Sequence, residues 1–207
     1  MSKPILVGLF LLCGAVLADE ATSPVKGTRI LETVLDVDQS TDATCGPAAL
    51  EAILAHYGVQ ASEGAISADT NLDPEVGAQP EDLARVAEGF GIKTEWRDKL
   101  TLEDLEREIV AGNPVLILTQ AWKTDGGLKW EEAWDDGHYL VVIGIDAKAV
   151  YCEDPSLHGE RGVIPREEFL ARWHGWTSDD EKAERQGMLF RRGTPAKAPP
   201  TKWVPIE

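Results

Sequence analysis

Basic side chains are scarce in this sequence. Its 20 Lys and Arg residues are outnumbered by 36 Asp and Glu residues, which gives a formal net charge of −16 at pH 7. Because phosphate binding depends on clustered Lys and Arg, this balance excludes nucleic acid as an expected partner. The acidic excess predicts a soluble, self-repelling surface, with attraction of basic substrates as the alternative.

A hydrophobic run long enough to cross a bilayer is also lacking. The apolar stretch Ile5 to Leu17 falls short of the roughly 20 residues that a spanning helix needs. Lys3 precedes this stretch and Ala18 follows it, a pattern typical of an export signal that is cleaved after Ala18. Lipoprotein anchoring at Cys13 is the alternative, which the bulky Leu12 disfavours. We therefore expect a periplasmic or extracellular protein without a stable membrane span.

Cysteine is scarce as well, with Cys13, Cys45 and Cys152 as the three examples. If Cys13 leaves with the signal peptide, the mature chain has room for at most one disulfide. A bridge between Cys45 and Cys152 is one interpretation. The other is that Cys45 is a reactive thiol and Cys152 is a thiol packed in the core.

The chain of 207 residues, 43% of them hydrophobic, is long enough to bury one substantial core and predicts a single folded domain. We expect a signal peptide at 1–18, a polar leader at 19–29, the domain at 30–192 and a Pro-rich tail at 193–207. The tail has too little apolar surface to fold alone.

Helices are predicted in the first half of the domain and strands in the second half. Expected helices cover 45–57, part of 61–76, 79 to 89 or 91, 101–110 and, later, 166–173. Expected strands cover 92–96, 115–119, 139–146, 150–153, 162–164 and 188–191, and 30–37 is a short strand or an extended arm. This order indicates an α+β fold with a mostly antiparallel sheet.

Cys45 begins the clearest helix of the sequence. A helix N-terminus stabilises a thiolate through its aligned dipole and free N–H groups. Pro47 is tolerated in the first turn, and Gly46 allows a substrate backbone to approach closely. The alternative is a small buried cysteine that only packs.

His138 and Asp154 stand at the ends of two predicted strands. His138 begins a strongly apolar strand, and Asp154 follows the next strand and precedes Pro155. If the strands form a hairpin across 146–149, the two side chains meet at one end of the sheet. There Asp154 can orient the His138 imidazole as a general base. A structural histidine and a turn-capping aspartate are the alternatives.

Gln39 lies on the loop that enters the helix of Cys45, six positions before it. Its side-chain amide and the Cys45 backbone N–H can donate to the oxyanion that forms when a thiolate attacks a carbonyl. An ordinary solvated loop glutamine is the alternative.

Three segments together resemble the bacteriocin-processing, double-glycine leader cysteine peptidases of family 39 and their stand-alone relatives. The segments are Gln39 to Leu50, Gly137 to Gly144 and Tyr151 to Ser156. The resemblance implies a papain-like fold and a peptide or protein substrate, with no metal or organic cofactor. It makes Cys45 the nucleophile, His138 the base, Asp154 its orienter and Gln39 the oxyanion-hole residue.

The sequence also departs from that family. Leader peptidases are commonly fused to a transporter and its ATPase, whereas this chain has a predicted export signal and no phosphate-binding Gly-Lys loop. The identity of the substrate therefore does not carry over, and the resemblance alone points to Gly-Gly specificity. The stretch 122–136, with three tryptophans before His138, looks like an added loop that helps to select substrate, and a lid or packing flap is the alternative.

We therefore expect an exported cysteine peptidase. An acyltransferase that uses the same residues and a non-catalytic peptide-binding module on the same fold are the alternatives. The sequence does not indicate an oligomeric state.

Overall fold

The structure is a computed structural model that describes residues 24–122, 127–176 and 181–192. The predicted signal peptide and C-terminal tail, and the first part of the polar leader, lie outside these residues. Within the described ranges, no helix has the length and apolar character that crossing a membrane requires.

The helices follow the sequence pattern closely. They are α1 (Cys45–His56), α2 (Glu63–Asp69), α3 (Pro80–Gly89), α4 (Leu102–Ala111), α5 (Arg166–Arg172) and the short 3-10 turn η1 (Trp130–Glu132). The strands are β1 (Ile92–Arg97), β2 (Val115–Gln120), β3 (Gly137–Ile145), β4 (Ala149–Glu153), β5 (Gly162–Pro165), β6 (His174–Trp176), β7 (Lys182–Glu184) and β8 (Gly187–Arg192).

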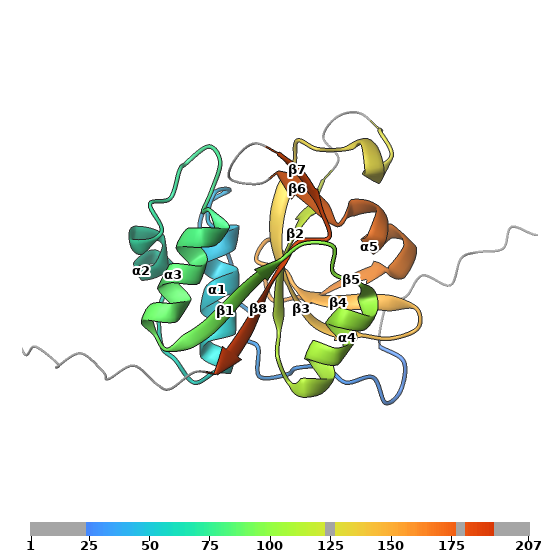
Figure 1. The fold of residues 1–207 in the computed structure, drawn as a ribbon, viewed down its shortest axis with the longest axis horizontal. Helices are drawn as coiled ribbons and strands as arrows, with labels where there is room; N and C mark the ends of the chain where they lie inside the picture. Colours follow the sequence, from blue (N-terminus) through green and yellow to red (C-terminus); the bar gives the residue numbers. More distant parts are fainter. Residues whose placement is uncertain (1–23, 123–126, 177–180, 193–207) are drawn as a thin grey trace, which may run out of the picture.

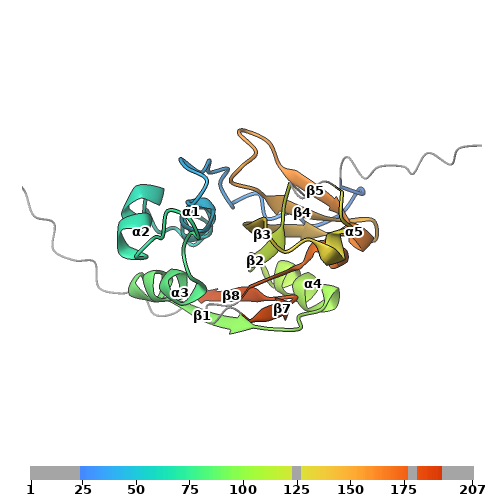
Figure 2. The same ribbon diagram turned by 90° about the horizontal axis from the view of Figure 1, so that it is seen from above.

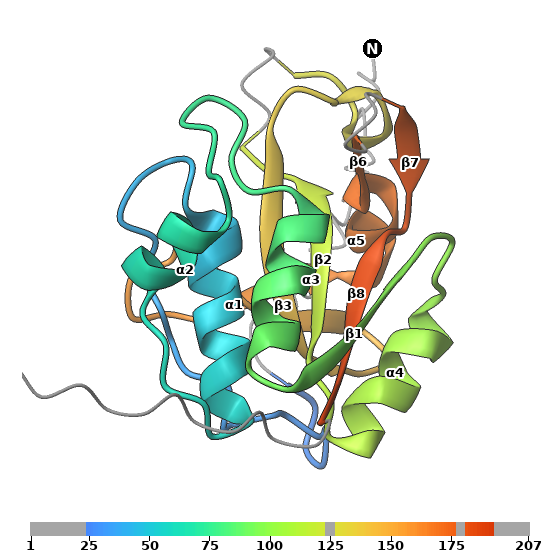
Figure 3. The same cartoon turned by 60° about the vertical axis from the view of Figure 1, so that its left-hand side comes forward.

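Six of these strands form one antiparallel sheet in the order β1-β8-β2-β3-β4-β5. After its first residue, β3 is buried along its whole length, and α1 and α4 both pack against it. Helices α1 to α3 lie together on one side of the sheet, while α4 and α5 lie on the other (Figures 1, 2 and 3). The fold is α+β, with helices first and a mostly antiparallel sheet second, as the sequence predicts.

The N-terminus of α1 lies directly against β3 because residue 46 has no side chain. A Cβ at Gly46 would lie 3.1 Å from Cδ2 of Tyr139 and 3.2 Å from Cδ1 of Leu83. Gly46 is therefore needed for the packing of α1 against β3, rather than for the approach of a substrate backbone. This packing sets the distance of Cys45 from the sheet.

The segment 30–37 is an extended arm rather than a regular strand. Leu31 N–H donates to the carbonyl oxygen of Ile143 at 2.9 Å, and Ile30 forms an isolated bridge with Gly144. A Cβ at Gly144 would lie 2.3 Å from Cδ1 of Ile30, so only glycine lets the arm cross β3 at this point. The pairing of β3 with β4 is irregular between Val142 and Gly144, where the arm crosses.

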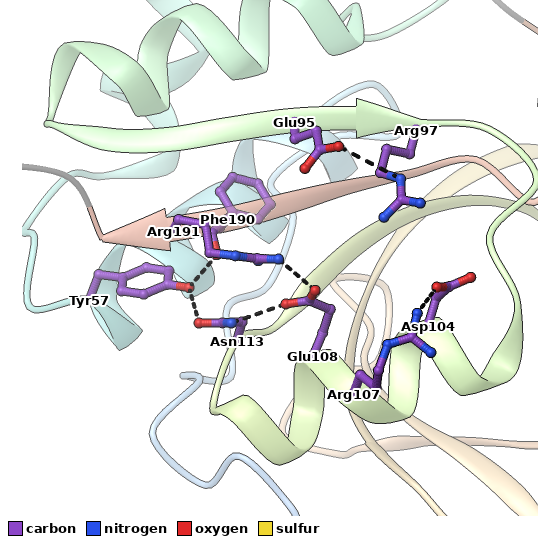
Figure 4. A network of polar contacts seen from close by, with 9 residues as sticks. All are labelled: Tyr57, Glu95, Arg97, Asp104, Arg107, Glu108, Asn113, Phe190 and Arg191. Carbon is purple, nitrogen blue, oxygen red and sulfur yellow. Dashed lines mark hydrogen bonds and ion pairs between the residues drawn. The ribbon is translucent and has the colours of Figure 1, made fainter.

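A polar network joins the far end of α1 to α4 and β8 (Figure 4). The Tyr57 hydroxyl donates to the carbonyl oxygen of Phe190 at 3.0 Å, and burial raises the pKa of this tyrosine to about 12. Glu108 accepts from Arg191 Nη2 at 2.5 Å and from Asn113 Nδ2 at 3.0 Å. These contacts tie the helical side of the molecule to the sheet at the end opposite Cys45.

The sequence pattern does not predict the hairpin of β6 and β7, whose strands have three residues each. Backbone pairing joins them, and the Lys182 ammonium lies 4.2 Å from the centroid of the Trp134 ring and 5.3 Å from that of Trp176. These cation–π contacts stabilise β6 and β7. Each strand is too short to show a periodic pattern in the sequence.

Helix α4 begins with a capping box, which gives a test of local stability. Thr101 Oγ1 accepts from Asp104 N–H at 3.1 Å, and Asp104 Oδ2 accepts from Thr101 N–H at 2.8 Å. Thr101→Ala removes one half of this exchange and should lower the free energy of unfolding by about 1 kcal/mol in urea denaturation. Thr101→Ser keeps the hydroxyl and should stay near wild type. Equal losses in both variants would contradict this assignment.

Candidate active site

Cys45 is the first residue of α1 and is largely buried, with 8% of its surface exposed. Its thiol therefore lies where the free N–H groups of the first helical turn and the helix dipole favour negative charge. The first turn contains no acidic side chain that would oppose this effect.

The β3 and β4 hairpin brings His138 and Asp154 together. The two strands pair antiparallel, with Val141 opposite Glu153. His138 Nε2–H donates to Asp154 Oδ1 at 2.7 Å, and the His138 side chain is only 2% exposed. The hairpin that the sequence predicts is thus present, and its two end residues form a buried hydrogen bond.

Ser156, which the sequence reading missed, holds the same carboxylate oxygen. Its backbone N–H and its hydroxyl both donate to Asp154 Oδ1, at 2.9 and 2.8 Å. Burial alone raises the pKa of Asp154, but the hydrogen bonds from His138 and Ser156 outweigh it and leave the pKa below its ordinary value. A serine two residues after an aspartate is typical of an Asx turn, and that signal was available in the sequence.

Two opposing effects set the protonation of His138. Burial lowers its pKa, whereas the hydrogen bond to Asp154 and the nearby Cys45 side chain raise it, to about 9 in balance. Nε2 is engaged by Asp154, and Nδ1 is buried without a hydrogen-bond partner among the described residues. Nδ1 is therefore the nitrogen left to exchange a proton with the Cys45 thiol.

Gln39 lies beside the turn that follows Asp154. Its backbone N–H donates to the carbonyl oxygen of Pro155 at 2.8 Å. Its side-chain Nε2 donates to the carbonyl oxygen of Thr41 at 3.0 Å, while Oε1 is buried and has no partner among the described groups. Because an amide nitrogen carries two hydrogens, one N–H of Gln39 remains to bind an incoming oxygen.

The Trp122 ring covers His138, with 4.8 Å between ring centroids and 55° between ring planes. Trp122 has a left-handed backbone, φ 56°, and its surface is 57% exposed. The tilted ring therefore contacts the imidazole while much of its own surface stays open to solvent. The sequence reading placed Trp122 in an added loop and did not predict this contact, because a positive φ leaves no sequence signal outside Gly, Asn and Asp. Residues 123–126 of that loop lie outside the described residues.

A cavity of about 380 Å³ opens beside Cys45. One wall comes from residues 75–80, and the other from Trp134, Asp135, Gly137 and Trp176, with Leu118 and Tyr139 completing the lining. The volume is in the range of known ligand sites. A second cavity of about 300 Å³, lined by Trp173 and His174 among others, does not include Cys45.

Cys152 lies within a strand of the sheet, whereas Cys45 lies at the N-terminus of a helix. It is fully buried in β4, and burial raises the pKa of its thiol far above the ordinary value. Both cysteines are free thiols in the structure, so the alternative of a bridge between them is not realised.

Three solved structures that are similar to this chain are described as peptidases or proteases. One is described as a C39-like peptidase from Bacillus anthracis, with 20% identity, a TM-score of 0.62, and 81% of this chain and 99% of that chain covered. Another is the peptidase domain of Streptococcus ComA, a bifunctional ABC transporter of a quorum-sensing pathway, at 18% identity, TM-score 0.55 and coverage of 74% and 95%.

A third similar structure is a double glycine motif protease from an AMS/PCAT transporter in complex with the leader peptide. It shares 22% identity and a TM-score of 0.54, with 81% of this chain and 96% of that chain covered. These likenesses show the papain-like fold of C39 peptidases. No curated protein matches the sequence.

The family comparison covers most of the domain. The model of the Peptidase_C39 like family matches residues 32–179, a span that includes Gln39, Cys45, His138 and Asp154. The chain belongs to the Peptidase_C39 like family.

Proposed function

We propose that this protein is an exported cysteine peptidase. In this proposal Cys45 is the nucleophile, His138 the general base, Asp154 its orienter, and Gln39 a donor of the oxyanion hole. The observation that carries it is the 2.7 Å hydrogen bond from His138 Nε2 to Asp154, which leaves Nδ1 for a thiol at a helix N-terminus. Export rests on the predicted signal at 1–18.

Attack on the peptide bond is the first step. Proton transfer from Cys45 Sγ to His138 Nδ1 precedes attack, and the raised pKa of His138 favours the resulting imidazolium. The thiolate then forms a C–S bond to the carbonyl carbon, and the C=O electron pair moves onto oxygen. The backbone N–H of Cys45 and the free N–H of Gln39 donate to this oxyanion.

Breakdown of the tetrahedral intermediate follows. The C–N bond breaks, and the imidazolium of His138 gives its proton to the leaving amine, which leaves a thioester on Cys45. Water, deprotonated by His138, then attacks the thioester and releases the acid product and the thiol.

A peptide is the substrate class that we propose. The cavity beside Cys45 runs between the 75–80 segment and Trp134, and a peptide in extended form fits between two such walls. The likeness to a double glycine motif protease solved with its leader peptide supports this class. Glu75 and Asp135 are among the lining residues, so the cleft is acidic in character.

Covalent labelling tests the nucleophile. We expect iodoacetamide to label the reduced mature protein, which begins at Asp19 and lacks Cys13, once at Cys45, because Cys152 is fully buried and burial raises its pKa. Cys45→Ala should abolish both labelling and peptide cleavage, whereas the matched Cys152→Ala should keep both. Intact mass and peptide mapping report the site, and labelling that persists in Cys45→Ala would refute the assignment.

Product mass separates hydrolysis from acyl transfer. For a peptidase we expect the free carboxylic acid as the product, even when an amine such as glycinamide is added. Predominant formation of the amide adduct would instead establish an acyltransferase that uses the same thioester.

The pH dependence tests the protonation of His138. Acylation needs the imidazolium as acid, and the pKa of His138 is raised to about 9, so kcat/KM for peptide cleavage should fall only as pH rises through about 9. Asp154→Asn removes one of the two groups that raise this pKa, so the alkaline limb should move to lower pH. The same change should reduce kcat/KM by more than about tenfold. A limb that Asp154→Asn leaves in place would argue against the His138 assignment.

A further inference from the structure

The segment 34–39, which leads to Gln39, has no regular secondary structure. Two side chains hold its backbone, one from the last residue of β4 and one from the loop that follows β4. Val37 N–H donates to Glu153 Oε1 at 2.9 Å. Arg161 donates through Nη2 to the carbonyl oxygen of Val34 at 2.7 Å and through Nη1 to that of Leu35 at 3.4 Å.

Glu153 and Arg161 also form an ion pair with each other. The Glu153 side chain is fully buried and that of Arg161 is 38% exposed. Burial raises the pKa of Glu153 to about 7, although the Val37 N–H and Arg161 act to lower it. A buried pair of this kind adds little stability compared with apolar residues of similar volume, so its value lies in the geometry that it fixes.

The same region connects directly to the catalytic pair. Glu153 is the last residue of β4 and precedes Asp154, which accepts the hydrogen bond from His138. Immediately after it, Pro155 accepts from the Gln39 backbone N–H at 2.8 Å. One end of β4 therefore holds both the carboxylate that orients the base and the segment that carries the amide donor.

We propose that Glu153 and Arg161 are positioning residues that hold Gln39 in register with the Cys45 nucleophile. The inference rests on the proposed function, because it assigns them a task in forming the oxyanion hole. Neither side chain lines the cavity beside Cys45, and both act through the backbone of residues 34–37.

Gln39 needs positioning residues because an oxyanion donor tolerates little change in its distance from the oxyanion. Such a donor acts when it lies about 2.7 to 3.1 Å from the developing charge. A shift of about 1 Å loses much of the effect. Because the 34–39 segment lacks regular pairing of its own, the contacts to Glu153, Arg161 and Pro155 help to set the position of Gln39. An ion pair of Asp38 with His158 and a hydrogen bond from Ser40 to Glu63 act beside them.

Two probes of Cys45 separate the oxyanion hole from the nucleophile. Iodoacetamide alkylates the thiolate by displacement of iodide and forms no oxyanion. The aldehyde acetyl-glycyl-glycinal adds Sγ to its carbonyl carbon, and the carbonyl oxygen takes the thiol proton through His138. Only the second reaction places an oxygen where Gln39 donates, so the comparison isolates the contribution of Gln39.

The variants are Arg161→Lys and Glu153→Gln in the full mature chain. Arg161→Lys keeps the charge and removes the fork that reaches two carbonyl oxygens, and Glu153→Gln keeps the shape and removes the charge. The matched control is Arg166→Lys, because Arg166 Nη1 also donates to a backbone carbonyl, that of Asp146 at 2.7 Å, without a contact to the 34–39 segment.

We expect both variants to raise the dissociation constant for the aldehyde by about tenfold or more. The rate of alkylation by iodoacetamide should stay at the wild-type value. Gln39→Ala should weaken the aldehyde by about 10²-fold, and adding Arg161→Lys to it should bring no further loss. Arg166→Lys should change neither measurement.

Three results would overturn the inference: unchanged aldehyde binding in both variants, a parallel fall of alkylation and aldehyde binding, or losses that multiply with Gln39→Ala. A different result overturns the proposed function. If iodoacetamide alkylates Cys45 in the wild-type protein but the aldehyde does not bind, Cys45 is a reactive thiol that does not attack a carbonyl, and the proposed peptidase function is refuted.

Discussion

The hydrogen bond between His138 and Asp154 is the interaction on which the candidate site depends. It exists because β3 and β4 form one hairpin, so that residues 16 positions apart in the sequence meet at 2.7 Å. The bond engages one nitrogen of the imidazole, raises the pKa of His138 against the effect of burial, and leaves the other nitrogen for Cys45. Ser156 holds the carboxylate, and Trp122 covers the ring.

The rest of the fold brings the helical side of the molecule to this pair. Gly46 lets the start of α1 lie against Tyr139 of β3, and Tyr57 at the other end of α1 is hydrogen bonded to β8. Cys45 and His138 thus lie on separate layers of the fold, and the packing of these layers sets the distance between the two side chains. Because the interior is close-packed, small displacements of these two side chains are resisted. Proton exchange between a thiol and an imidazole requires such a constant distance.

The sequence was sufficient for the elements that depend on local patterns. The apolar run after His138, the turn at 146–149 and the Pro after Asp154 predicted the hairpin, and the spacing after Cys45 predicted α1. It was insufficient where contacts join distant residues. Arg161 reaches Val34 across 127 positions, and Trp122 covers His138 through a left-handed backbone. Strands of three residues, such as β6 and β7, carry no period to detect, and they are stabilised by neighbours from other segments.

The protonation state of His138 tests the central claim most directly. The imidazole ¹⁵N chemical shifts of His138, followed by NMR through a pH titration of the wild-type protein and of Cys45→Ala, report both ring nitrogens. The account predicts an imidazolium that persists to about pH 9 in the wild type and a lower pKa once the Cys45 side chain is removed. A neutral imidazole at neutral pH, with a titration that Cys45→Ala leaves unchanged, would contradict the coupling of thiol, imidazole and carboxylate.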